Sequence, residues 1–165
     1  MAIRAAGVPR APAAPTTTVN SNVSVKIDWT APSNGGNSIQ SYLVKIREDG
    51  GTYSTVPNCN DVATNSCTVP ISVLKAAPYE LAWGSIVKAT VIARNAVGSS
   101  EESAAGGEAI IVTNPNPPNP LNNNALVTSE SVIGLTWVEP AENGGSPVID
   151  YRVSWDQGRN EFVVL

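Results

Sequence analysis

Short runs in which apolar and polar residues alternate fill most of the chain. Val23, Val25, Ile27 and Trp29 alternate with polar residues, which is the period-two pattern of a strand with one buried face. Residues 74–82 have room for one turn of helix at most, because Pro78 interrupts them. The runs therefore predict an all-β fold of about seven strands, arranged as a β-sandwich. Besides the strand at 23–29, we predict strands at 16–19, 42–46, 52–56, 69–73, 86–93 and 108–113.

The pattern repeats itself within the chain. Residues 23–46 recur almost in register at residues 131–155. A repeat of this period indicates a tandem array of small β domains. Between the copies, the segment Asn-Pro-Asn-Pro-Pro-Asn-Pro favours extended polyproline geometry and predicts a semi-rigid spacer. We therefore expect a proline-rich arm at 1–13, a complete domain at 14–113, a linker at 114–120 and the first half of a second domain at 121–165.

Four aromatic residues occupy equivalent places in the two copies. Trp29 and Tyr42 of the first copy correspond to Trp137 and Tyr151 of the second. Exposed aromatic rings can form a platform that stacks on sugars, but identical placement on alternating strands favours the interior. We predict that all four are core residues.

Composition excludes several classes of function. The chain has 165 residues, a net charge of −4 and 15% charged residues, with no clustered basic face of the kind that binds nucleic acid. No apolar run is long enough to span a membrane. The first ten residues lack the apolar centre of a secretory signal, so we expect an internal or mature start.

The two cysteines, Cys59 and Cys67, lie eight residues apart among turn-forming residues. This spacing suits a disulfide across a hairpin and, with it, an oxidising compartment outside the cytosol. The alternative, a metal site, would need four ligands, and the chain has no histidine to complete the set. We therefore expect a disulfide and no metal.

No constellation of residues indicates catalysis or a cofactor. Without histidine, the usual general base of hydrolases is absent. The acidic pairs Glu48–Asp49, Glu101–Glu102 and Glu139/Glu142 are predicted to be solvated loop carboxylates. Asn22-Val-Ser24 is the one conventional N-glycosylation sequon, placed before a predicted edge strand. We expect no enzyme activity and no cofactor, and Asn22 is the candidate N-glycosylation site.

Several motifs together resemble the fibronectin type III family. They are a Trp followed by Pro at 29–32, a Gly-Gly and then Tyr-x-Val at 35–44, and Val-x-Ala-x-Asn-x-x-Gly at 91–98. The resemblance implies an immunoglobulin-like β-sandwich, one complete domain followed by a partial one. Val87 stands where the family usually has a tyrosine, so the hydrogen bond of that tyrosine is expected to be missing, and the cysteine pair is not general to the family. The stretch from Cys67 to Ala93 is similar to variants in large surface proteins of protists and algae.

The second copy supplies about 45 residues, which cannot enclose a sandwich core by themselves. Three explanations stay open. The chain is a segment of a longer protein, the first domain covers the open face, or a neighbouring chain adds strands, with the arm at 1–20 as the natural donor. The last arrangement would be head to tail and would build filaments.

We predict a non-catalytic extracellular or cell-surface protein, a structural or adhesive building block of a filamentous or surface assembly. Its expected partners are further copies of itself, neighbouring repeats of the same protein, and glycans. One alternative is the ligand-recognition ectodomain of a receptor, with specificity in the loops at 33–38, 95–100 and 143–147. The other is an accessory module of a secreted carbohydrate-active enzyme.

Overall fold

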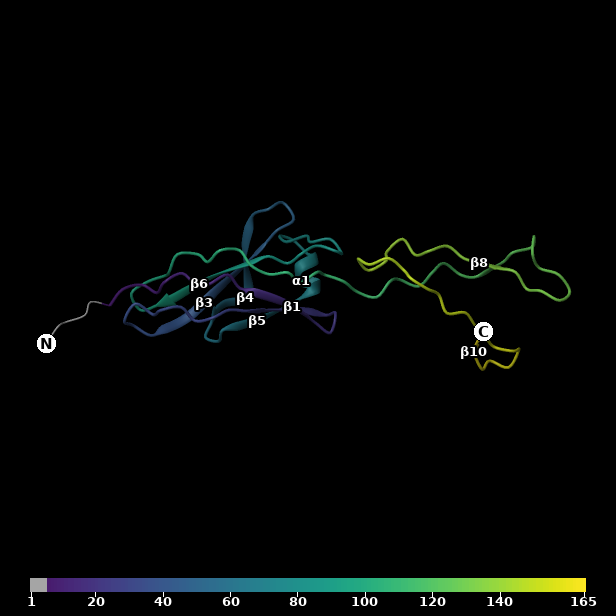
Figure 1. Ribbon diagram of the computed structural model, residues 1–165, viewed down its shortest axis with the longest axis horizontal. Coiled ribbons are helices and arrows are strands. Elements are labelled where there is room, and N and C mark those ends of the chain that lie inside the picture. The colour runs from purple at the N-terminus through teal and green to yellow at the C-terminus, as the bar shows by residue number, and fades with distance from the viewer. Residues whose placement is uncertain (1–5) are drawn as a thin grey trace. The chain divides into compact units, whose positions relative to one another are not determined.

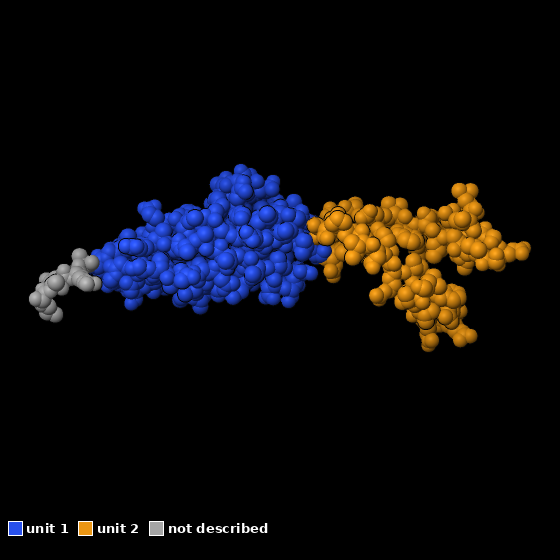
Figure 2. All heavy atoms as spheres, viewed as in Figure 1, with its two compact units in different colours: residues 1–113 blue, residues 114–165 orange. Residues whose placement is uncertain are grey.

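The computed structural model describes residues 6–165, so the first five residues of the predicted arm lie outside it. The chain divides into two compact units, Met1–Thr113 and Asn114–Leu165, which Figure 2 colours separately. Each unit has its own strands, and each is described by itself. The first unit contains β1 (Thr16–Asn20), β2 (Ser24–Asp28), β3 (Ile39–Arg47), β4 (Tyr53–Val62), β5 (Ser66–Pro70), α1 (Ile71–Lys75) and β6 (Ala89–Asn95), as Figure 1 shows.

The first unit is a sandwich of two antiparallel three-stranded sheets. One sheet has the order β1-β2-β5 and the other β4-β3-β6. Alternate residues of each strand point to the space between the sheets, because side chains alternate across a strand. Val25, Ile27, Val44 and Val91 are fully buried there, in one continuous hydrophobic core. The period-two pattern of the sequence thus becomes the shared interior of the two sheets.

The strand predicted at 69–73 is cut short by a helical turn. Pro70 pairs with Ser24 as the last residue pair between β5 and β2, and it has no amide with which to extend the ladder. The chain then forms α1, whose Ile71 and Leu74 are buried against the core. The prediction that Ile71 and Val73 continue the strand was therefore wrong, and the helical turn lies earlier than the predicted 74–82.

The strand predicted at 108–113 is also absent as a regular strand. The segment does run alongside residues 84–89, and the Val87 amide donates to the Ala109 carbonyl at 2.8 Å. However, the Thr17 hydroxyl of β1 accepts hydrogen bonds from the Glu108 and Ala109 amides and donates to the Val87 carbonyl. Because this side chain occupies the amides, it replaces a ladder at this edge of the sandwich with isolated bridges.

The second unit contains only short strands. They are β7 (Asn122–Asn123), β8 (Leu135–Thr136), β9 (Ser154–Trp155) and β10 (Val163–Val164). β7 pairs with β8 and β9 with β10, both antiparallel. The predicted strand around Tyr151 is thereby reduced to two residues beyond it. Open edges explain the short ladders, because a two-stranded ribbon is only marginally stable in water.

Candidate functional site

The disulfide joins the two sheets of the first unit. Cys59 lies in β4 and Cys67 in β5, and their Cα atoms are 5.8 Å apart. Because β4 belongs to one sheet and β5 to the other, the bond holds the sheets together at the side where the chain crosses between them. Both side chains are buried. The bond is therefore shielded from solvent reductants as well as being a cross-link.

The four repeated aromatic residues form two pairs of the same geometry. Trp29 and Tyr42 meet edge to face with ring centroids 5.3 Å apart and planes at 65°. Trp137 and Tyr151 meet at 5.4 Å and 64°. Trp29 and Tyr42 are 7% and 3% exposed, whereas Tyr151 is 38% exposed. Trp137 is half-buried. The interior position predicted for Trp137 and Tyr151 is not reached, because the second unit has no strands to cover them.

Asn22 lies at the tip of the turn between β1 and β2. Its backbone has a positive φ of 54°, a conformation that Asn tolerates well in tight turns. The residue is exposed, while Ser24, the third residue of the sequon, is at the start of β2 and buried. The position leaves room for a glycan on Asn22, and its occupancy stays a prediction.

Asn95 is a junction that the sequence analysis did not anticipate, although it lies in the Val-x-Ala-x-Asn-x-x-Gly motif. Its buried Nδ2 donates to the Gly7 and Asn34 carbonyls at 2.8 and 2.9 Å. Its Oδ1 accepts from the Val97 and Gly98 amides at 2.9 and 3.1 Å. One side chain thus ties together the N-terminal arm, the loop after β2 and the turn after β6.

Gly35 allows the arm to approach that loop. A Cβ atom at Gly35 would lie 2.4 Å from the Val8 carbonyl oxygen, and its φ is +67°. The Gly7 amide donates to the Gly35 carbonyl at 2.8 Å, and the Arg10 amide donates to the Ser33 carbonyl at 2.9 Å. The described part of the arm is therefore fixed to its own unit, which argues against its use as a strand donor to another chain.

Tyr79 makes a buried hydrogen bond at a position different from the one usual in the family. Its hydroxyl donates to the Thr55 carbonyl at 2.8 Å. Burial, and then the negative charge of Glu48, raise the pKa of the Tyr79 phenol. Val87 is fully buried and apolar. The Tyr79 hydrogen bond anchors the segment between α1 and β6 to β4.

The acidic pairs singled out in the sequence take part in local contacts or face solvent. Glu48 accepts a hydrogen bond from Ser54, while Glu139 and Glu142 are exposed. Across residues 6–165, no group of three or more histidine, cysteine or acidic side chains could hold a metal ion. These carboxylates therefore serve local structure or face solvent.

Glu102 is the carboxylate with a clear electrostatic role. It forms an ion pair with Lys45 at 2.6 Å and accepts a hydrogen bond from Thr90. Burial acts to raise the pKa of Glu102, but the hydrogen bonds from Lys45 and Thr90 and the charge of Lys45 together lower it. The cluster joins the segment after β6 to the outer face of β3.

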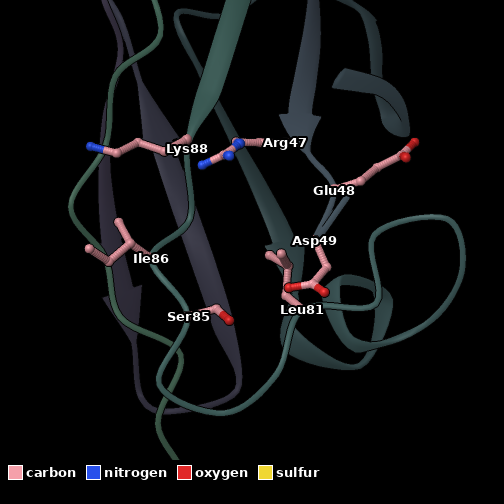
Figure 3. Close-up of a pocket in the computed structure, with 7 residues that line it drawn as sticks. All are labelled: Arg47, Glu48, Asp49, Leu81, Ser85, Ile86 and Lys88. Carbon is pink, nitrogen blue, oxygen red and sulfur yellow. The ribbon is translucent and has the colours of Figure 1, made fainter. Parts of the chain in front are cut away.

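A hollow of about 250 Å³ in the first unit is lined by seven residues, charged as well as apolar, which include Arg47, Asp49, Ser85, Ile86 and Lys88 (Figure 3). The figure shows the Glu48 carboxylate directed away from the other side chains, and the Lys88 amine directed away from the Arg47 guanidinium. The lining carries both charge signs and no histidine or cysteine. No hydrogen bond joins the Ser85 hydroxyl to a carboxylate of this lining, so the hollow offers separate polar and apolar contacts.

Taken together, these features define the class of protein: an immunoglobulin-like β-sandwich with a cross-sheet disulfide, followed by a second unit of short antiparallel strands. The family model described as "Fibronectin type III domain" matches residues 10–106, more than half of the chain. The chain therefore belongs to the fibronectin type III family, and the predicted family and fold class are both confirmed.

Curated relatives are large proteins that contain such modules. "Cell adhesion molecule-related/down-regulated by oncogenes" of Xenopus laevis is 31% identical over 157 residues, which cover 91% of this chain and 12% of the relative. Titin of Drosophila melanogaster is 34% identical over 150 residues, 88% of this chain and 1% of the relative. The chain thus spans only a small part of each.

Among solved structures, a titin module from human cardiac muscle is 26% identical, with a TM-score of 0.47 over 62% of this chain and 91% of that chain. Titin kinase with its flanking domains is 25% identical, with a TM-score of 0.49 over 61% of this chain and 17% of that chain. No helix in the described residues is long and apolar enough to cross a membrane.

Proposed function

We propose that the chain is a non-catalytic structural or adhesive module that acts outside the cell as one element of a row of similar modules. The observation that carries the proposal is the repetition of the fibronectin type III pattern within the chain. Each copy contains the same edge-to-face pair of aromatic rings. Repeated modules extend a protein in one direction. Such a protein can hold its binding sites at a distance from the surface to which it is attached.

Two features support a mechanical role for the module. The Cys59–Cys67 bond joins the two sheets, so they cannot separate at that side without breaking a covalent link. The proline-rich linker at 114–120 favours an extended and semi-rigid connection to the next unit. A filament or surface appendage built of such modules would resist both unfolding and bending.

The location outside the cell is supported by the disulfide, since such bonds persist in oxidising compartments. Asn22 at an exposed turn suits N-linked glycosylation in the same compartment. The name of one relative, a cell adhesion molecule-related protein, agrees with attachment at a cell surface. We therefore propose a glycoprotein whose partners are neighbouring repeats of the same protein.

A second candidate is ligand recognition by the loops at one end of the sandwich. Asn95 brings together the loop at 33–38 and the turn at 95–100 through hydrogen bonds to Asn34, Val97 and Gly98. Loops fixed by a rigid scaffold are common binding sites. This reading would place the chain in the ectodomain of a receptor.

The test is labelling of intact source cells with an antibody raised against the 165-residue chain. We expect labelling without permeabilisation, and extended particles or fibres in micrographs of the labelled material. Labelling that appears only after permeabilisation would contradict the location. Labelling of isolated globular receptors would favour the second candidate.

A further inference from the structure

The first ladder of the second unit repeats the register of the first unit. Asn123 pairs with Leu135 between β7 and β8, as Thr17 pairs with Ile27 between β1 and β2. In the internal repeat, Leu135 corresponds to Ile27. The second unit therefore already contains the start of one sheet in its proper alignment.

The second ladder does the same for the other sheet. Trp155 pairs with Val163 between β9 and β10, as Ile46 pairs with Ser54 between β3 and β4. Trp155 corresponds to Ile46 in the repeat. Both starting ladders of a sandwich are thus present in residues 121–165, and register is what decides which side chains face the interior.

The interior positions of this half sandwich are open to solvent. Ile133 is 74% exposed, while its counterpart Val25 is 0% exposed. Trp155 is 46% exposed, and its counterpart Ile46 is again 0%. The same side-chain positions that form the core of the first unit form a surface in the second.

That surface is a neutral groove of about 470 Å³. Besides two serines, it is lined by Leu121, Ile133, Leu135, Val153, Trp155 and Leu165. No charged residue lines it, so water gains few polar contacts there, and covering the groove would be favoured by about 25 cal/mol for each Å² of apolar surface buried. Apolar grooves of this kind mark places where another segment binds.

The first unit shows what covers the equivalent surface. There, β5 pairs with β2 and β6 pairs with β3. These later strands and the segments around them supply fully buried side chains to the shared core. They are Val69, Leu74, Val87, Val91 and Ile111.

We propose that the groove of residues 121–165 receives the second half of a fibronectin type III sandwich, a polypeptide segment with the apolar pattern of residues 57–113. One strand of this segment adds to the free side of β8, as β5 adds to β2. Another adds to β9, as β6 adds to β3. The proposal concerns the surface itself and does not depend on the location or the adhesive role proposed above.

A second copy of the chain is a poorer occupant. Its own residues 57–113 are already buried in its first unit, where Val69 and Val91 are 0% exposed. The described part of its arm is hydrogen-bonded to the loop after β2 of the same unit. Of residues 6–165, a second copy has its own half sandwich left to offer, and this lacks the strands that β8 and β9 need.

The experiment appends a second copy of residues 57–113 directly after Leu165 of the full chain. Leu165 holds the place of Val56 in the repeat, so the appended copy starts in register. A matched control carries Val69→Asp and Val91→Asp in the appended copy only. We expect hydrogen exchange at the β8 and β9 amides to slow by about 100-fold or more relative to the control. Tryptophan emission should shift to shorter wavelength in the extended chain and not in the control.

A companion measurement adds the separate polypeptide 57–113 to the unextended chain, with and without Ile133→Asp. We expect the same shift in emission, and its loss in the Ile133→Asp variant. Equal exchange at β8 and β9 in extended and control chains, together with no response to the separate polypeptide, would overturn the proposal. Dimerisation of the unextended chain that protects these amides would overturn it too, because the occupant would then be a second copy.

Discussion

The rings of Trp137 and Tyr151 lie 5.4 Å apart and meet edge to face at 64°. Trp29 and Tyr42 meet in the same way within a closed core. The arrangement therefore does not need the strands that would bury it, and it belongs to the first half of the module. The contact between the two rings and their burial are therefore separable in this chain.

Trp29→Ala and Trp137→Ala should differ in their effect on stability. Removing the buried Trp29 leaves a cavity and should lower the free energy of unfolding of the first unit by about 3–5 kcal/mol. Trp137 lies in the other unit and is only half-buried, so Trp137→Ala should leave the first unit almost unchanged. Urea unfolding followed by hydrogen exchange at β2 and β3 amides measures both. Equal losses for the two variants would contradict the assignment of separate cores.

Loss of the disulfide should destabilise the first unit. Cys59→Ala with Cys67→Ala should cost about 2–3 kcal/mol, as expected for a cross-link that closes a short loop. Both thiols are buried, so reduction of the unmodified protein should be slow in buffer and fast in denaturant. Calorimetry of the double variant and thiol labelling with time test the two statements. Rapid labelling of the folded protein after mild reduction would show that the bond is not shielded.

Asn95→Ala should release three segments at once. The variant loses hydrogen bonds to the Gly7 and Asn34 carbonyls and to the Val97 and Gly98 amides, and we expect a loss of about 2–3 kcal/mol, since buried groups are left without partners. Asn95→Asp is the matched variant, because it keeps the acceptor oxygen and replaces the Nδ2 donor with a charged oxygen that the Gly7 and Asn34 carbonyls repel. Exchange of the Gly7 amide should therefore accelerate in both variants, and exchange of the Val97 amide mainly in Asn95→Ala. An unchanged Gly7 amide in both would refute the junction.

Because of Glu102, the free energy of unfolding of the first unit should depend on pH in the acidic range. Its pKa is lowered in the folded protein, so the folded state binds fewer protons than the unfolded state as the pH falls. The stabilisation is fully present above the ordinary carboxyl pKa and is lost as the pH falls through the lowered folded pKa. Because the side chains of Lys45 and Glu102 are 26% and 34% exposed, solvent weakens the pair to about 1 kcal/mol or less.

Glu102→Gln is the corresponding variant. It should reduce stability at pH 7 and flatten the decline that begins below the ordinary carboxyl pKa of 4.5, as measured by chemical unfolding at each pH. Lys26 and Asp28, an ion pair in which both side chains are well exposed, provide the control: Asp28→Asn should change stability at pH 7 less than Glu102→Gln does. A profile identical to that of the unmodified protein would show that Glu102 does not contribute.

The sequence by itself determined the class of the fold and the repeat. Alternation of apolar residues predicts strands because side chains point to opposite faces in turn, and it predicted the interior positions at Val25, Ile27 and Val44 before any partner strand was known. The repeat of Trp29 and Tyr42 at Trp137 and Tyr151 is likewise visible in the sequence alone. So is the disulfide partner of Cys59, since the chain has only two cysteines.

Only the tertiary structure decided where the pattern fails. The Thr17 hydroxyl accepts hydrogen bonds from the Glu108 and Ala109 amides, which therefore do not form a strand ladder. This contact joins residues about 90 positions apart. Asn95 gathers loops in the same long-range manner. The exposure of Tyr151, whose sequence pattern matches that of the buried Tyr42, also depends on strands elsewhere. A local apolar pattern predicts which side chains are stabilised by burial. They become buried only when a segment that is distant in the sequence packs over them.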